Sequence, residues 1–223
     1  MYRPPYAKHL VDDGALVPLG RGLCERPSFE LAPLLLGRWV VRSDRDGLSG
    51  GPIVEAEAYG GPEDLASHAR AGRTRRTAPM FGRPGHAYVY RVYGLHWCLN
   101  VVSDRDGQAG AVLIRALAPG HGLGLVRSRR RRPADPEARL TAGPARVCQA
   151  LAIDGAFDGH DLTLGKGLWL ADPDPVERQR LVEGNLVAGP RVGVAYAGRG
   201  WAEKDWRFGI RGHPSLSRPF AAP

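Results

Sequence analysis

The sequence lacks the long apolar segments that membrane proteins require. Although 43% of the 223 residues are hydrophobic, no apolar run approaches the ~18 residues of a transmembrane helix. Residues 1–5 also lack the apolar stretch of a secretory signal peptide. We therefore expect a cytoplasmic chain with no membrane partner and with enough apolar residues for a packed core.

Cysteine is scarce, and its spacing excludes several kinds of site. Cys24, Cys98 and Cys148 lie far apart in the sequence and form no CxxC pair, so neither a zinc ribbon nor a redox motif is indicated. Dispersed cysteines, odd in number, suit a reducing compartment. The chain also has no P-loop, no GxSxG nucleophile elbow and no HExxH metal motif.

Lysine is nearly absent, whereas arginine is abundant. Of the 31 lysine and arginine residues, only Lys8, Lys166 and Lys204 are lysines. The net charge is +8. Arginines gather at residues 70–76 and again at residues 127–132. An excess of arginine alone could reflect codon bias in a GC-rich genome. The clustering favours a polyanionic partner such as nucleic acid, because arginine binds phosphate bidentately.

Residues 53–59, IVEAEAY, are typical of a strand that ends at a glycine turn. Alternation along a strand places Val54, Ala56 and Ala58 on one face, and Glu55, Glu57 and Tyr59 on the other. The second face could be a solvated outer surface, which is common in antiparallel sheets. Alternatively it is a buried site, because a buried carboxylate must be paired or functional.

A β-hairpin over residues 87–102 is the clearest local signal. Two β-prone runs flank Gly94 and Leu95, which predicts a two-residue type II′ turn. In that register, residues whose numbers sum to 189 face each other, so Tyr93 and Asn100 share one face and Tyr90 lies on the other. Tyr93 falls at the tip of the hairpin. An aromatic ring there is either an exposed part of the turn or inserts into a partner.

Residues 111–117 form an apolar run with Arg115 inside it. A buried arginine needs an anion, and Glu57 or Glu55 is the expected partner. Asn100 interrupts a similar run, so its side chain should be hydrogen-bonded or face a site.

Short elements account for the remainder of the chain. We expect a helix at residues 31–36 with Pro33 in its first turn, a strand at 38–42, a hairpin turn at 43–47 and one helical turn at 63–68. Gly143 and Pro144 open a further helix with Val147, Cys148 and Leu151 as its buried stripe. Residues 120–139 form an ordered loop or a short helix. Further strands are predicted at residues 168–170, 191–196 and 206–211.

Several segments together resemble the alkyladenine (3-methyladenine) DNA glycosylase family. They are residues 53–59, His68, Met80 with Phe81, residues 88–100, 113–117, 143–151 and 191–194. Their order and near-family spacing over roughly residues 28–212 make this match far more specific than any single motif.

The resemblance implies a mixed α/β (α+β) fold. It would be one domain around a curved antiparallel sheet, with a protruding hairpin and short peripheral helices. We expect this glycosylase domain at residues 28–212, after a surface segment at 1–27 and before a C-terminal tail at 213–223. The resemblance also implies a monomer that uses neither a metal nor a cofactor, with double-stranded DNA containing damaged purines as its partner.

The resemblance further assigns roles to individual residues. Glu57 would activate water, Arg115 would help to place Glu57, and Tyr93 would replace the flipped nucleotide in the duplex. The base pocket would be lined by Tyr59, His68, Tyr90 and Asn100, and Asn100 would disfavour the amine of normal guanine. Candidate phosphate contacts are Arg73, Arg76, Arg91 and Arg146.

Two points remain open at the level of sequence. The family places Tyr90 and Asn100 on the same side, which conflicts with the two-residue turn unless a bulge or another register reconciles them.

The alternatives to a monofunctional glycosylase are a non-catalytic basic nucleic-acid-binding domain, which leaves Glu57 unexplained, and a small-molecule hydrolase, which does not need the arginine clusters.

Overall fold

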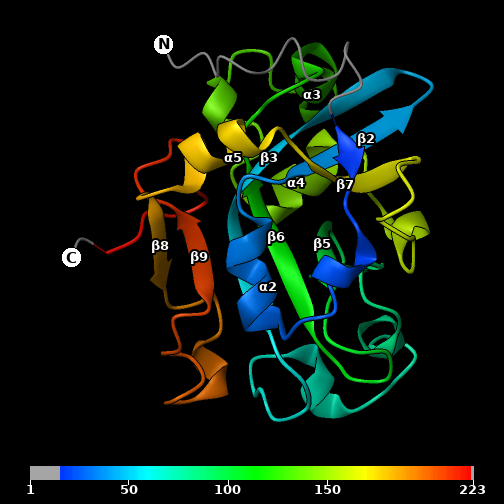
Figure 1. The fold of residues 1–223 in the computed structure, drawn as a ribbon, viewed down its shortest axis with the longest axis vertical. Coiled ribbons are helices and arrows are strands. Elements are labelled where there is room, and N and C mark those ends of the chain that lie inside the picture. The colour runs from blue at the N-terminus through cyan, green and yellow to red at the C-terminus, as the bar shows by residue number, and fades with distance from the viewer. Residues whose placement is uncertain (1–15, 222–223) are drawn as a thin grey trace.

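In the computed structural model, which describes residues 16–221, the chain winds around one curved antiparallel sheet (Figure 1). The strands within these residues are β1 (Val17–Pro18), β2 (Trp39–Asp44), β3 (Gly47–Tyr59), β4 (Ala87–Val92), β5 (His96–Val102), β6 (Ala111–Leu117), β7 (Leu168–Asp172), β8 (Leu186–Gly189) and β9 (Arg207–Ile210). Their order across the sheet is β1-β7-β2-β3-β6-β5-β4, with β9 also pairing with β3 and β8. Every pairing between these strands is antiparallel.

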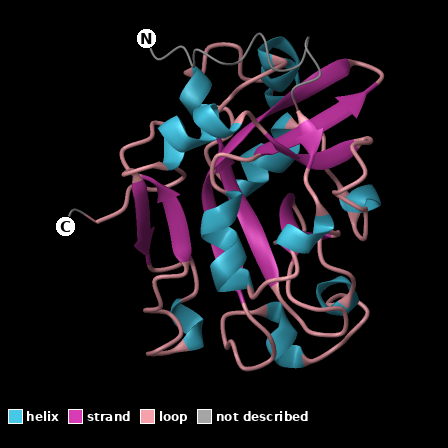
Figure 2. Cartoon of the chain, in the orientation of Figure 1, coloured by secondary structure: helices cyan, strands magenta, loops and turns pink. Residues whose placement is uncertain are grey.

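Helices are short and lie around the sheet (Figure 2). The α-helices are α2 (Ser28–Leu35), α3 (Leu123–Arg130), α4 (Pro144–Ala150) and α5 (Pro175–Val182). The 3₁₀ turns are η1 (Arg21–Leu23), η2 (His68–Ala71), η3 (Ala78–Phe81), η4 (Glu137–Arg139), η5 (Gly155–Phe157) and η6 (Ala195–Ala197). This arrangement confirms the single mixed α/β domain. No helix within residues 16–221 is long and apolar enough to span a bilayer.

Strand β3 organises the sheet because its two halves have different neighbours. Its first half pairs with β2 through a tight hairpin, as residues 43–47 predicted. Its second half lies between β6 and β9, and its register with β6 shifts on either side of Glu55, which marks a bulge. The segment that carries Glu55 and Glu57 is therefore a central strand, where neither carboxylate reaches bulk water.

The apolar face of β3 lies in the main core. Val54, Ala56 and Ala58 are fully buried there, where α2 and α4 pack against the sheet. The stripe predicted for α4 is confirmed, since Val147, Cys148 and Leu151 belong to the same core. Because this face is filled with apolar side chains, the opposite face of the same strands is left to form the site.

Three predictions about local structure outside the β4–β5 hairpin were wrong. Helix α2 begins at Ser28, so Pro33 lies in its last turn instead of its first. The guanidinium of Arg178 donates to the carbonyls of Leu34 and Leu36 at the end of this helix. Residues 63–67 form turns, and the 3₁₀ turn begins only at His68. Residues 191–196 form no strand but a turn that leads into η6, while the neighbouring strand β8 lies earlier in the chain.

The register of the β4–β5 hairpin differs from the predicted one by one residue. Tyr88 pairs with Asn100, and Tyr90 pairs with Cys98, so facing residues sum to 188. The loop therefore has three residues, 93–95, and it begins with Tyr93 and Gly94 in left-handed conformations. This register resolves the conflict left by the sequence, because it places Tyr88, Tyr90, Cys98 and Asn100 on one face.

Candidate active site

The carboxylate of Glu57 is fully buried and receives three hydrogen bonds. Oε2 accepts from the hydroxyl of Tyr59 at 2.9 Å and from Nη1 of Arg115 at 3.1 Å. Oε1 accepts from the backbone amide of Val192 at 2.7 Å. A carboxylate has about four lone-pair positions, so one acceptor position on Oε1 has no donor among the described residues.

Arg115 connects Glu57 to its neighbour Glu55. Nε lies 3.0 Å from Oε1 of Glu55, and Nη1 reaches Glu57 on the same face of β3. Both partners expected from the sequence are therefore bound by one guanidinium. Burial alone would lower the pKa of Arg115, but Glu57 and Glu55 raise it above its ordinary value. Arg115 thus stays protonated, as a buried ion pair requires.

An aromatic wall stands beside the carboxylate. The rings of Tyr88 and Tyr90 are 5.2 Å apart and tilted by 33°, and His68 meets Tyr90 edge-on at 4.6 Å. Burial raises the pKa of the Tyr88 phenol to about 12 and that of Tyr90 higher still. Burial, followed by the charge of Glu57, also raises the pKa of Tyr59. All three phenols are therefore neutral and present electron-rich faces.

His68 is a neutral imidazole in this setting. Burial lowers its pKa to about 4, and the charges of Arg76 and Arg70 add to the effect. Its Nδ1 lies 3.0 Å from the hydroxyl of Tyr88. The tautomer of the imidazole decides which of these two atoms is the donor. A neutral His68 can form a hydrogen bond, but it cannot deliver a proton as an acid near pH 7.

Tyr59, His68, Tyr88, Tyr90, Arg115 and Val192 line one cavity of about 500 Å³. Glu57 is fully buried and is not part of this lining, but its three hydrogen-bond donors are. Its floor comes from β3, β4, β5 and β6, and its other walls come from η2, η3, the start of α4 and residues 192–196. Asn100 is buried in this wall, and its Nδ2 donates to the carbonyl of Tyr88 at 3.0 Å. Asn100 is therefore both hydrogen-bonded and facing a site, as its position in the sequence predicted. Within the described residues, no group of three or more His, Cys, Asp or Glu could hold a metal.

Tyr93 lies at the mouth of this cavity with 91% of its surface exposed. Its φ of 51° is left-handed, a conformation that is uncommon for a bulky residue and marks local strain. Leu95, two residues later on the same tip, is 72% exposed. The hairpin therefore presents two apolar side chains to the surroundings without support from the core.

The four candidate phosphate-binding arginines differ in their surroundings. Arg76 lies over the ring of Tyr90 at 5.5 Å and borders the cavity, as does Arg91, which stacks on Trp97 at 5.4 Å. Arg73 is exposed on the loop between η2 and η3. Arg146 is half-buried on α4, next to the cavity residues Pro144 and Ala145. None of the four has an ion-pair partner among the described residues.

Sequence reasoning missed the buried ion pair that positions the backbone amide of Val192. Arg191 and Asp64 form a buried bidentate ion pair at 2.6 and 2.9 Å, and Arg191 also donates to the carbonyl of Ala58. This pair fixes the turn that carries the amide of Val192. The RVGV segment was included in the resemblance, but strand periodicity concealed the turn.

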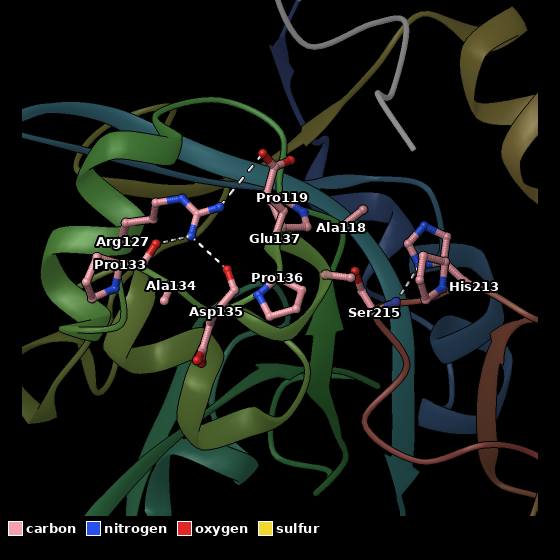
Figure 3. A pocket seen from close by; sticks show the side chains of 12 residues that line it. Ala118, Pro119, Arg127, Pro133, Ala134, Asp135, Pro136, Glu137, His213 and Ser215 are labelled. Carbon is pink, nitrogen blue, oxygen red and sulfur yellow. Dashed lines mark hydrogen bonds and ion pairs between the residues drawn. The ribbon is translucent and has the colours of Figure 1, made fainter. Parts of the chain in front are cut away.

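A second cavity, of about 520 Å³, lies away from this chemistry, between the 133–138 loop and residues 213–215 (Figure 3). The guanidinium of Arg127 in its wall is already bound to the carbonyls of Pro133 and Asp135. Arg129 of the same arginine-rich segment is paired with Asp44. Part of the arginine cluster at residues 127–132 is therefore structural.

Comparison with known proteins gives one consistent family. The family model described as methylpurine-DNA glycosylase matches residues 23–214. A protein of Rhodopseudomonas palustris (strain BisB18) named "Putative 3-methyladenine DNA glycosylase" is 45% identical over 91% of this chain and 92% of its own length. A human protein named DNA-3-methyladenine glycosylase is 42% identical over 92% of this chain and 69% of its own length. A protein of Methanocella arvoryzae with the same name as the first is 41% identical over 90% of this chain and 96% of its own.

Proposed function

This chain belongs to the methylpurine-DNA glycosylase family, and we propose that it excises damaged purines from duplex DNA with a water activated by Glu57. As a member of this family it is a hydrolytic DNA repair glycosylase. The observation that carries the proposed mechanism is the buried Glu57 carboxylate, which is held by three donors beside an aromatic cavity.

The free acceptor position on Oε1 of Glu57 defines the chemistry. A water bound there would give one proton to the carboxylate while its oxygen bonds to C1′ of the sugar. The N-glycosidic bond breaks, its electron pair leaves with the base, and the product is an abasic site. Positive charge that develops on the sugar is stabilised by the same carboxylate. Arg115 and Tyr59 would hold Glu57 in the orientation that this step requires.

The cavity suits a purine that carries a positive charge. An alkylated base stacked on Tyr90 and Tyr59 would gain about 0.5–2 kcal/mol from each cation–π contact. Such a base leaves as a neutral molecule, so its departure needs no proton from the protein. Asn100, fixed by the carbonyl of Tyr88, would exclude the exocyclic amine of normal guanine by steric contact.

The glycosidic bond of a neutral lesion such as hypoxanthine is harder to break, because the leaving base then needs a proton. His68 cannot supply one near pH 7, since burial lowers its pKa to about 4. We therefore expect cationic alkylated purines to be released faster than deaminated ones. The role left for His68 is to form a hydrogen bond with the bound base.

The base would reach this cavity by leaving the duplex. Flipping costs a few kcal/mol of lost stacking and pairing, and Tyr93 at the exposed hairpin tip would fill the gap. Arg76 and Arg91 border the cavity and Arg146 adjoins it, where the phosphates flanking a flipped nucleotide would lie, and the exposed Arg73 would bind a phosphate further along the DNA. Contacts of this kind make binding steeply dependent on salt.

Release of free base from a duplex with one lesion tests this function. Duplexes with a single N-alkylated purine, and matched undamaged duplexes, should be incubated with the enzyme and then treated with alkali to cleave abasic sites. We expect cleavage only at the lesion. Salt-dependent binding without release would support the non-catalytic DNA-binding alternative and would contradict the proposal.

A further inference from the structure

Ser217 lies in the segment after β9, outside the residues that match the family, which end at residue 214. It nevertheless contacts the catalytic network directly. Its amide donates to Oε2 of Glu55 at 2.5 Å, and its hydroxyl donates to Oε1 of Glu55 at 2.9 Å. The hydroxyl oxygen accepts from Nε and Nη2 of Arg115 at 3.2 and 3.0 Å.

The three nitrogens of the Arg115 guanidinium therefore donate to three different residues. Nη1 is bound to Glu57, Nε to Glu55 and Nη2 to Ser217. Among the described residues, Nη2 has no acceptor other than Ser217. Removal of the Ser217 hydroxyl would release the edge of the guanidinium that lies away from Glu57, and the plane of the group could then rotate about its bond to Glu55.

The segment that carries Ser217 is anchored independently of this hydroxyl. Arg207 donates to the carbonyls of Arg218 and Pro219 at 3.3 and 3.1 Å, and its guanidinium lies 3.8 Å from the ring centre of Phe220. The Phe220 ring packs so closely on Gly209 that a Cβ there would come within 2.6 Å of it. The backbone at residue 217 is therefore held in place from its C-terminal side even without the serine hydroxyl.

We propose that Ser217 is a positioning residue for base excision: it fixes Arg115 in the orientation in which Nη1 meets Glu57. This inference rests on the proposed function, because it acts through Glu57. Ser217 does not border the cavity, so it should not touch the base or the DNA. Its effect should fall on the rate of bond cleavage and not on the affinity for the lesion.

Three substitutions separate positioning from a general structural effect. Ser217→Ala removes the hydroxyl, and Ser217→Thr keeps it. Ser215→Ala is the matched control, because Ser215 is buried in the same segment and its hydroxyl has no hydrogen-bond partner among the described residues. Each variant should be measured for single-turnover base release, for the Kd of the same lesion duplex and for its melting temperature.

We expect Ser217→Ala to slow release by about tenfold, a modest part of what a 1 Å misplacement can cost, with Kd unchanged. Ser217→Thr should recover most of the rate, and Ser215→Ala should match the wild type. If Ser217→Ala does not fold, Ser217→Cys, whose thiol is a weak hydrogen-bonding group, takes its place with the same expected loss.

A wild-type release rate in Ser217→Ala, or a loss confined to melting temperature or Kd, would overturn the inference while the proposed function stands. A wild-type enzyme that releases no base would overturn the proposed function itself. The wild-type result therefore distinguishes the two failures.

Discussion

The backbone amide of Val192 lies 2.7 Å from Oε1 of Glu57. This contact joins the end of the central strand to a turn that lies 135 residues later. It supplies the carboxylate with a donor that no side-chain substitution can remove directly. The position of the amide depends on the neighbouring Arg191, whose guanidinium is buried and paired with Asp64.

Asp64→Asn should disturb this amide from a distance. Breaking a buried ion pair by removal of one charge costs about 3–5 kcal/mol of stability, because the partner charge is left uncompensated. We expect a clear fall in the free energy of unfolding. At temperatures where the variant is still folded, excision should also be slower. Urea unfolding and single-turnover release check this, and unchanged stability would show that the pair is not the anchor of the turn.

Tyr93→Ser should weaken lesion binding without affecting the fold. An inserted ring can recover about 1–3 kcal/mol of stacking, and the ring of Tyr93 makes no contribution to the core. The fraction of flipped base, reported by a fluorescent base analogue at the lesion, should fall. The salt dependence of non-specific binding should stay the same. The loss should be greater for a lesion in a stable pair than for one in a mismatch.

Leu95→Ser is the matched control for Tyr93, because Leu95 is also exposed on the tip but lies outside the cavity lining. We expect it to keep most of the flipped population. An equal loss in both variants would assign the effect to tip hydrophobicity in general. No loss in either would leave Tyr93 as part of a turn.

Acid should destabilise the protein through His68. Burial lowers the pKa of His68 from 6.5 to about 4, so between these values the unfolded chain binds a proton that the folded chain does not. The contribution of this group to stability is therefore complete above pH 6.5 and is lost as the pH falls towards 4. His68→Gln should lose less stability than the wild type between pH 7 and pH 5 in urea titrations. Parallel losses in the two proteins would contradict the neutral, buried state of His68.

Base release should not be followed by cleavage of the DNA strand. A lyase step needs an amine that forms a Schiff base, and of the described lysines neither Lys166 nor Lys204 borders the cavity. Lys204 lies over the rings of Trp201 and Trp206 at 4.4 and 4.7 Å. Borohydride should trap no covalent adduct between enzyme and DNA. A trapped adduct would require an amine nucleophile and would show that the enzyme is not monofunctional.

Alternation along β3 was predictable because it depends only on neighbouring residues. It separated Val54, Ala56 and Ala58 from Glu55 and Glu57, and the structure confirms both faces. The partner of Arg115 was also predictable, since a charged residue inside an apolar strand requires an anion.

The hairpin register was less accessible to sequence reasoning. Gly94 fits either a two-residue or a three-residue loop, and the choice depends on Tyr93 adopting a left-handed conformation that its side chain disfavours. A shift of one residue exchanges the faces of every side chain on a strand. For this reason the sequence placed Tyr90 and Asn100 on opposite sides.

The roles of Val192 and Ser217 could not have been assigned by inspection of the sequence. Val192 acts through its backbone amide, which every residue except proline possesses. Ser217 is one of several serines, and its importance arises from the path of the chain after β9. Only the folded chain brings either residue to the carboxylates.

The central claim is that Glu57 performs the excision chemistry, and the comparison of Glu57→Gln with Glu55→Gln tests it most directly. Both carboxylates are fully buried and bound to Arg115. Only Glu57 also receives donors from the cavity residues Tyr59 and Val192. Single-turnover release from a lesion duplex should be measured alongside the Kd of the same duplex.

We expect Glu57→Gln to bind the lesion as tightly as the wild type and to release base at least ~100-fold more slowly, the low end for loss of a general base. Glu55→Gln should show a smaller loss. Release by Glu57→Gln at a rate close to that of the wild type would contradict the account.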